Sequence, residues 1–225
     1  MRKAGLFLVF ALLSTNILFG QYSKINLGVE GGPSAVLLWG NDALNESFSL
    51  RQSFSAGVSF QYNFNRIFAL RTNVAFERKG NSTTVLARDE QGNFLGEFSL
   101  LNNLDYLTIP LLARASFGNK VKFFVNGGPF IGFLLKQTYV HEAFNEFPEA
   151  KYDGTDTYNS KDFGATFGLG FTINLTKSIL LSLEGRNNLG LYNISKLSVI
   201  GDGKVLTNSA QLLFGVSYQF GGTFE

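Results

Sequence analysis

The sequence predicts an all-β protein, an eight-stranded antiparallel up-and-down transmembrane β-barrel. Three observations predict it: apolar and polar residues alternate along eight segments, the links between segments are alternately short and long, and residues 1–20 have the make-up of a secretory signal. Side chains point alternately to the two sides of a strand, so alternation places the apolar residues of each segment on one surface. Outer-membrane barrels combine an even strand number, short turns at one end, longer loops at the other and an outward apolar band.

The composition excludes several classes of protein. The 225 residues are 45% hydrophobic and 16% charged, with no cysteine and one histidine. Disulfides, thiolate metal sites, cysteine nucleophiles and a lipid-modified N-terminal cysteine are therefore excluded, and a histidine-cluster metal site cannot be built. Together with the motifs considered below, this composition leads us to expect no metal, no cofactor and no catalytic site.

The positive charge of the chain lies at its N-terminus. Arg2 and Lys3 supply two of the 19 basic residues, which leaves 17 basic against 17 acidic residues in the rest of the chain. A nucleic-acid-binding surface needs a basic face or stripe. The sequence therefore predicts no nucleic-acid partner.

The first segment resembles a cleaved signal in its three parts. Arg2 and Lys3 precede an apolar stretch from Ala4 to Leu13, and the small residue Gly20 stands before Gln21. The alternative is a membrane-anchoring helix, but the apolar run is shorter than the roughly 20 residues that a spanning helix needs. We therefore expect a signal peptide over residues 1–20, cleavage after Gly20, and one barrel domain over residues 21–225.

The first four expected strands cover residues 25–30, 53–64, 68–77 and 107–117. Ile25, Leu27 and Val29 alternate with polar or small residues in the first. The second is the most regular, with six apolar positions from Phe54 to Phe64 interleaved with Ser, Gly, Gln and Asn. The third and fourth repeat the alternation and carry charged residues on the polar face.

The last four expected strands cover residues 121–136, 163–175, 179–186 and 210–220. In the first of these strands, Val, Phe and Ile residues lie on one face and Lys, Asn and Gly residues lie on the other, with Lys136 on the polar face. Apolar residues recur at every second position throughout residues 163–175 and 210–220. In residues 179–186, Ile and Leu lie on one face and Ser, Glu and Arg lie on the other. Each of these patterns is typical of a strand with one apolar face.

The links between the segments support the same topology. Residues 63–66, 118–120 and 176–178 predict tight turns rich in Asn, Gly and Lys. Four longer polar stretches, at about residues 34–50, 80–103, 137–161 and 191–208, are expected as loops. Both chain ends would then lie on the side of the short turns.

A soluble sandwich or a lipocalin-like barrel is the competing all-β fold, with the apolar face turned inward. The polar face here is rich in Gly, Ser, Thr and Asn, whereas a water-facing sheet would carry Lys and Glu. Small polar residues suit the narrow interior of an eight-stranded barrel, and a continuous face of Phe, Leu, Ile and Val suits lipid. This difference favours the membrane barrel.

Four segments carry a resemblance to a known family; they are Gly28-Val-Glu-Gly-Gly, Leu104-Asp-Tyr-Leu-Thr-Ile-Pro-Leu-Leu-Ala-Arg, Phe124-Val-Asn-Gly-Gly-Pro-Phe-Ile-Gly and Asp162-Phe-Gly-Ala-Thr-Phe-Gly-Leu-Gly-Phe. The mature chain resembles the PorT-like outer-membrane β-barrel family of Bacteroidetes. The resemblance implies an outer-membrane barrel, with association with a type IX secretion machinery as one possible role. The end of the chain also resembles the recognition signal for the barrel-assembly machinery. Gly215, Tyr218 and Phe220 match the glycine and the two spaced aromatic residues of that signal.

Charged residues on the polar face form the candidate site. Alternation places six of them inside the barrel: Glu30, Arg71, Glu77, Arg114, Glu184 and Arg186. Charges in a narrow lumen must be paired or hydrogen-bonded, and three acids can pair with three arginines. The structural interpretation is a lumenal charge network that fills the barrel; the functional interpretation is a gate or an ion or proton path.

Two further motifs are weaker candidates. His141, in the third long stretch, is the only histidine that could serve as a base in a lipid-modifying or proteolytic barrel, but no Ser or Asp spacing around it suggests a nucleophile. Asp153-Gly-Thr-Asp-Thr-Tyr-Asn, with Asp162 further on, resembles a calcium loop without its full ligand spacing. We expect a solvated histidine and a polar turn.

These observations predict a non-enzymatic outer-membrane barrel, exported through its signal. It would be structural or partner-binding, and it could serve as an accessory of a secretion or envelope complex. A narrow channel for ions or small solutes is the alternative, and a lipid-modifying enzyme is the third. The expected partners are outer-membrane lipid, the barrel-assembly machinery during biogenesis, and other envelope or secretion proteins.

Overall fold

The computed structural model describes residues 24–40, 49–144, 148–198 and 203–220. They form nine strands and a short 3-10 helix: β1 (Ile25–Trp39), β2 (Arg51–Asn63), β3 (Phe68–Arg88), β4 (Phe94–Phe117), β5 (Val121–His141), β6 (Ala150–Asp153), η1 (Thr155–Thr157), β7 (Lys161–Asn174), β8 (Ile179–Gly190) and β9 (Leu206–Phe220). None of the helical structure in these residues is long and apolar enough to cross a membrane. The expected signal peptide, residues 1–20, lies outside the described residues.

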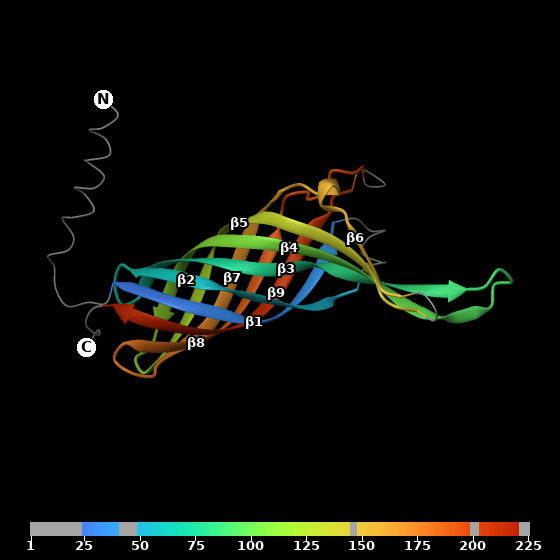
Figure 1. Cartoon of the computed structure of the whole chain (residues 1–225). Coiled ribbons are helices and arrows are strands. Elements are labelled where there is room, and N and C mark those ends of the chain that lie inside the picture. Colours follow the sequence, from blue (N-terminus) through green and yellow to red (C-terminus); the bar gives the residue numbers. More distant parts are fainter. Residues whose placement is uncertain (1–23, 41–48, 145–147, 199–202, 221–225) are drawn as a thin grey trace, which may run out of the picture.

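Eight of the strands close into a ring (Figure 1). Consecutive strands pair antiparallel, β5 pairs with both β4 and β7, and the first strand pairs with the last, from Ile25 opposite Phe220 to Trp39 opposite Leu206. The predicted all-β, antiparallel, up-and-down ring of eight strands is confirmed. The ninth strand, β6, was not expected; it pairs with the far end of β5, beyond the part that β7 covers.

The three tight turns are also confirmed, and all lie at one end of the ring, the turn end. Asn65 holds the β2–β3 turn, because its side-chain oxygen accepts hydrogen bonds from the backbone N–H groups of Ile67 and Phe68, both at 2.8 Å. Gly118 has φ +108° in the β4–β5 turn, a left-handed conformation that favours glycine. We call the opposite end of the ring, where the long links lie, the loop end.

The prediction that residues 80–103 form a loop is wrong. β3 and β4 remain paired from Phe68 opposite Ala115 out to Arg88 opposite Phe94, so most of this stretch is a hairpin that projects beyond the ring (Figure 1). β1 and β5 likewise run on to Trp39 and His141, into stretches expected as loops. The apolar face that marked each strand ends before the backbone pairing does, because only the wall of the ring needs that face.

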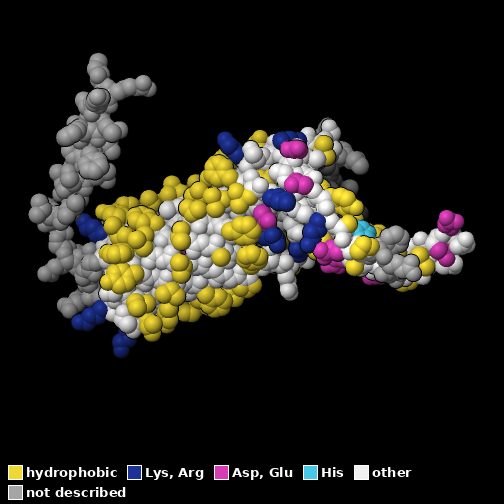
Figure 2. Space-filling view, viewed as in Figure 1, with side chains coloured by type: hydrophobic (Ala, Val, Ile, Leu, Met, Phe, Trp, Pro, Cys, Tyr) yellow, Lys and Arg dark blue, Asp and Glu magenta, His cyan; other side chains and the backbone are white. Residues whose placement is uncertain are grey.

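The outer wall of the ring is apolar (Figure 2). Val58, Phe123 and Leu169 face outward and are 59%, 62% and 68% exposed. At the loop-end limit of this band, Arg78 and Asp105 form an outward-facing pair, with Nε to Oδ1 at 2.6 Å and Nη2 to Oδ2 at 2.9 Å. The expected orientation of the alternating faces is therefore observed over the ring.

Lys136 departs from that orientation. The register between β4 and β5 shifts next to Asp105, so that Asp105 opposes Lys136 while Tyr106 opposes Leu134. The extra residue of this bulge reverses the alternation beyond it. The expected inward position of Lys136 is therefore wrong: its side chain is 58% exposed and lies 3.9 Å from the Asp153 carboxylate.

Candidate functional site in the barrel interior

Five of the six predicted lumenal charges form one group, the arginine cluster: Glu30, Arg71, Arg114, Glu184 and Arg186. Glu30 accepts hydrogen bonds from Arg71 Nη2 and, at 2.8 Å, from Arg186 Nη1. Arg186 Nε donates to Glu184 at 2.6 Å, and Arg114 Nη2 donates to the other Glu184 oxygen at 3.0 Å. All five side chains are at most 7% exposed. With three arginines and two glutamates the cluster has a formal charge of +1.

Polar neighbours donate or accept further hydrogen bonds in the arginine cluster. Asn126 Nδ2 donates to Glu184 at 3.2 Å, Gln61 accepts from Arg114 at 3.2 Å, and Asn73 accepts from Arg186 at 3.2 Å. The Arg114 guanidinium also lies 3.6 Å from the centre of the Phe124 ring. Buried charges are tolerated only when they are paired and hydrogen-bonded in this way.

Glu77, the sixth predicted residue, belongs to a second group, the lysine cluster, with Lys79 and Asp162. Lys79 Nζ donates to Asp162 at 2.9 Å and lies 3.9 Å from a Glu77 oxygen. Thr207 Oγ1 donates to the same Asp162 oxygen at 2.7 Å, and Gln211 Nε2 donates to Glu77 at 2.7 Å. Two acids and one lysine give this cluster a formal charge of −1, which balances the arginine cluster.

Lys79 and Asp162 are not among the predicted interior residues. Both follow from the alternation: Lys79 is two residues beyond the inward Glu77, and Asp162 precedes the outward Phe163. Lys79 lies just beyond the expected strand 68–77, and Asp162, just before the expected strand 163–175, is considered above only as part of a possible calcium loop. Both side chains are fully buried.

A glycine makes room for the arginine cluster. Gly168 of β7 opposes Arg186 on β8, and a Cβ atom at Gly168 would collide with the Asn126 side chain and lie 2.8 Å from Glu184 Oε1. The small residues that the sequence places on the polar face are thus used to admit long charged side chains from neighbouring strands.

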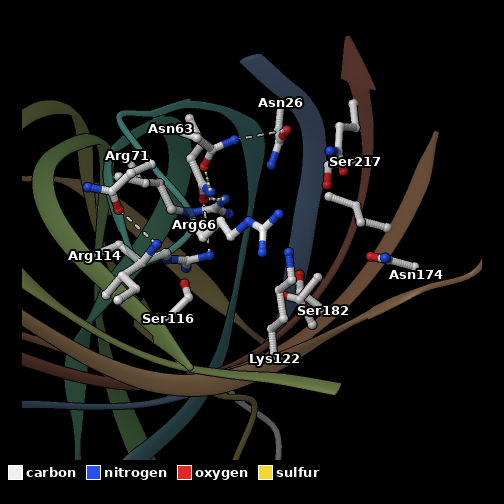
Figure 3. A pocket seen from close by; sticks show the side chains of 17 residues that line it. Asn26, Asn63, Arg66, Arg71, Arg114, Ser116, Lys122, Asn174, Ser182 and Ser217 are labelled. Carbon is white, nitrogen blue, oxygen red and sulfur yellow. Dashed lines mark hydrogen bonds between the residues drawn. The ribbon is translucent and has the colours of Figure 1, made fainter. Parts of the chain in front are cut away.

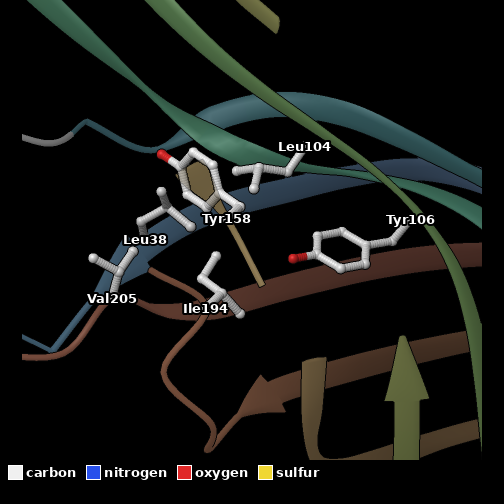
Figure 4. Close-up of a cluster of buried hydrophobic side chains, with 6 residues drawn as sticks. All are labelled: Leu38, Leu104, Tyr106, Tyr158, Ile194 and Val205. Carbon is white, nitrogen blue, oxygen red and sulfur yellow. The ribbon is translucent and has the colours of Figure 1, made fainter. Parts of the chain in front are cut away.

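An apolar group lies in the interior toward its loop end (Figure 4). This apolar plug consists of Leu38, Leu104, Tyr106, Tyr158, Ile194 and Val205. Three of its members come from the links: Tyr158 follows η1, and Ile194 and Val205 lie in the described parts of the β8–β9 link. Tyr158 accepts a hydrogen bond from Asn102 Nδ2 at 2.9 Å, and burial raises the pKa of its hydroxyl well above its usual range.

A polar cavity of about 60 Å³ lies at the turn end, which we call the vestibule (Figure 3). Its lining includes Arg71 and Arg114 of the arginine cluster, together with Arg66 from the β2–β3 turn and Lys122 from β5. Asn, Gln, Ser and Thr side chains make up most of the rest. From turn end to loop end, the interior therefore runs through the vestibule, the arginine cluster, the lysine cluster and the apolar plug.

Of the two weaker candidates, His141 and the Asp153 turn lie apart from these interior groups. His141 ends β5, and its ring packs against Phe98, with centroids 4.4 Å apart, so the expectation that it lies in a loop is wrong. Asp153 accepts hydrogen bonds from the Thr155 backbone and hydroxyl at 3.0 and 2.7 Å, whereas Asp162 lies inside the ring. Within the described ranges, no three His, Asp or Glu side chains are grouped as a metal ion would require.

The residues of the expected assembly signal lie on β9. Tyr218 and Phe220 face outward, half exposed, with ring centroids 4.8 Å apart. Gly215 faces inward, where a Cβ atom would lie 3.7 Å from the Glu30 Cβ atom. Recognition of these residues by the barrel-assembly machinery stays a prediction.

The comparisons with known proteins concern the whole ring. The family model for the outer membrane protein beta-barrel domain matches residues 19–196. None of the curated proteins matches the sequence. Among solved structures, the chain is similar to Neisserial surface protein A, with 14% identity, a TM-score of 0.48, and coverage of 86% of this chain and 97% of that one.

Two further solved structures are similar. The attachment invasion locus protein Ail of Yersinia pestis has 12% identity and a TM-score of 0.43, with 88% of this chain and 99% of that chain covered. The outer membrane protein W of E. coli has 13% identity and a TM-score of 0.44, with 90% and 100% covered.

Proposed function

Since this chain belongs to the outer membrane protein beta-barrel domain family, we propose that it is a non-enzymatic outer-membrane barrel with a closed interior that carries a partner-binding surface on its extended strands. The barrel is the scaffold, and the strand extensions at the loop end are the functional part. Export through a cleaved signal over residues 1–20 and association with a secretion or envelope complex belong to the same proposal.

The filled interior is the observation that carries the proposal. The interior of an eight-stranded barrel is only wide enough for side chains. Here the arginine cluster, the lysine cluster and the apolar plug follow one another along the axis, and their side chains are buried. A solute crossing the barrel would have to separate buried ion pairs and then enter an apolar layer, so a narrow channel is disfavoured.

The β3–β4 hairpin supports the partner-binding part. Outer-membrane barrels place short turns in the periplasm and long extensions outside the cell, which orients this hairpin away from the cell. Leu86, Phe94 and Leu95 on the hairpin are 53%, 58% and 52% exposed, beyond the outward Arg78–Asp105 pair that limits the apolar band. Apolar side chains exposed above a membrane surface are typical of protein-binding sites.

Conductance tests the closed interior. The mature protein, refolded in detergent and shown to be folded by a gel shift between unboiled and boiled samples, is added to a planar lipid bilayer. We expect no unitary conductance. Steady conductance steps from the folded protein, absent from a boiled sample, would overturn the closed interior and favour the channel.

Native size tests the partner-binding part. The tagged protein is extracted from its own outer membrane in mild detergent, and the particle is compared with that of a variant in which residues 82–100 are replaced by a short turn. We expect the full chain in a larger particle and the variant as a lone folded barrel. Equal particles of single-barrel size would contradict partner binding.

An enzymatic role of this protein is tested separately by substitution of His141. If His141→Ala alters the lipid A or phospholipid profile of the cell while Phe98→Ala, which removes the neighbouring ring, leaves the profile unchanged, the non-enzymatic proposal is wrong. We expect both variants to leave the lipid profile unchanged.

A further inference from the structure

The vestibule is more cationic than a structural cavity requires. Of the 17 residues that line it, four are basic (Arg66, Arg71, Arg114 and Lys122) and none is acidic. Ten others are neutral polar residues that can donate hydrogen bonds. The labelled side chains of several strands surround one space at the end of the ring (Figure 3).

The two glutamates of the arginine cluster do not neutralise the positive charge around the vestibule. Arg71 and Arg114 are held by Glu30 and Glu184, but the cluster keeps a net positive charge, and neither glutamate lines the vestibule. Arg66 and Lys122 add two further positive charges at the rim. Like charges gathered around a small cavity raise the local concentration of anions.

The buried arginines also have unused donors. Nε of Arg71 and Nε of Arg114 have no hydrogen-bond partner among the residues that the structure describes. Their side chains are 7% and 4% exposed, and both residues line the vestibule. A buried guanidinium N–H without an acceptor costs free energy, and an oxyanion would supply acceptors there.

We propose that the vestibule binds a phosphate-type oxyanion, either as a free phosphate or as the phosphate group of a lipid at the membrane surface. Arginine binds phosphate oxygens through its planar set of donors, and lysine adds a point charge. Arg66 and Lys122 would attract the anion at the rim, while Arg71 and Arg114 would hold it from the inner side. The cavity is too small for a large ligand, so only the phosphate group itself would enter.

The test uses the mature protein folded in a non-ionic, phosphate-free detergent, titrated with inorganic phosphate by calorimetry at constant ionic strength. The test variant is Arg66→Gln/Lys122→Gln, since both residues lie at the rim and outside the arginine cluster. The matched control is Lys120→Gln/Lys177→Gln, which removes the same charge from the turns of the same end without touching the lining.

We expect one phosphate per chain, an affinity reduced about tenfold or more in the test variant, and an unchanged affinity in the control. No binding, a similar loss in both variants, or several weak sites per chain would overturn the proposal, because each would mean that only general charge is involved. An unboiled gel sample of each variant verifies that it is folded.

A second arm distinguishes the source of the phosphate. The same titration is repeated in micelles that contain phosphatidylglycerol, with micelles containing an uncharged glycolipid as the control. If the anionic lipid abolishes phosphate binding and the glycolipid does not, the vestibule takes a lipid phosphate; if phosphate binds equally in both, it takes a free one. Binding in detergent does not depend on orientation or on a closed interior, so failure here leaves the proposed function standing.

Discussion

Glu184 is the residue whose neutralisation should most clearly disturb the interior. It accepts three hydrogen bonds, from Arg186 at 2.6 Å, Arg114 at 3.0 Å and Asn126 at 3.2 Å, with a side chain that is 3% exposed. Glu184→Gln keeps the shape, raises the formal charge of the arginine cluster from +1 to +2, and turns an amide N–H₂ toward an arginine donor. Removing one partner of a buried ion pair costs about 3–5 kcal/mol. Because the amide oxygen still accepts one bond, we expect about 3 kcal/mol.

The assay is urea unfolding of the protein in lipid vesicles, followed by the gel shift and by the fluorescence of Trp39, the single tryptophan. The double variant Glu184→Gln/Arg114→Met should lose less than the sum of the two single variants, because Met removes the uncompensated charge and keeps the contact with Phe124. Asp153→Asn, in the exposed pair with Lys136, is the control and should leave the unfolding midpoint unchanged. A free energy of unfolding for Glu184→Gln within about 0.5 kcal/mol of the parent would refute the reasoning.

Three further substitutions, one of them with a matched control, and one pH titration test other parts of the structure. Gly168→Val should lower the free energy of unfolding by about 1–3 kcal/mol by forcing Glu184 aside, whereas Gly185→Ala, whose Cβ would have only Leu169 O nearby at 3.9 Å, should be neutral in the same urea assay. Lys79→Met should cost about 3–5 kcal/mol, because Asp162 and Glu77 lose their cation; an unchanged urea midpoint would contradict this. Tyr158→Phe should cost about 1 kcal/mol through the bond from Asn102, and a loss equal to that of Lys79→Met would mean that the hydroxyl has a larger role. Hydrogen bonds from the Asn93 side chain and backbone lower the pKa of Asp89. The backbone N–H groups of Gln91 and Asn93, which donate to the ionised carboxylate, should therefore be protected from hydrogen exchange above about pH 4 and should lose this protection as the pH falls through the lowered pKa. Protection that does not change with pH would contradict this prediction.

The ring could be predicted from the sequence because lipid imposes a strict rule on it. Every second residue on the wall must be apolar, so Phe54 to Phe64 and Phe163 to Ile173 show their period directly. The tight turns were equally readable, since Asn65 and Gly118 meet local backbone needs that involve no distant residue.

The strand extensions could not be predicted in the same way. Beyond the ring, neither face of the β3–β4 hairpin has to be apolar, so the pairing of residues 80–88 with residues 94–103 leaves no regular pattern. The bulge beside Asp105 is likewise invisible, because Leu134, Leu135 and Lys136 read as an ordinary continuation of the strand.

The alternation of the sequence indicates six of the charged residues that lie in the interior, but it misses Lys79 and Asp162 and indicates the arrangement only in part. Alternation placed Glu30, Arg71 and Glu184 on the inner face, but their partners depend on how neighbouring strands are staggered. Glu77 consequently lies with Lys79 and Asp162, at a different level from the arginines. The apolar plug draws Tyr158 and Ile194 from irregular links, for which the sequence offers no period at all.

The pairing of the first strand with the last has a consequence for how the chain folds. Until β9 pairs with β1, one edge of β1 is free along its whole length, and the incomplete ring is an open sheet with two unsatisfied backbone edges and an exposed apolar face. Loss of β9 would therefore leave an open sheet whose two free edges can pair with other chains. Closure of the ring therefore depends on the fifteen residues of β9.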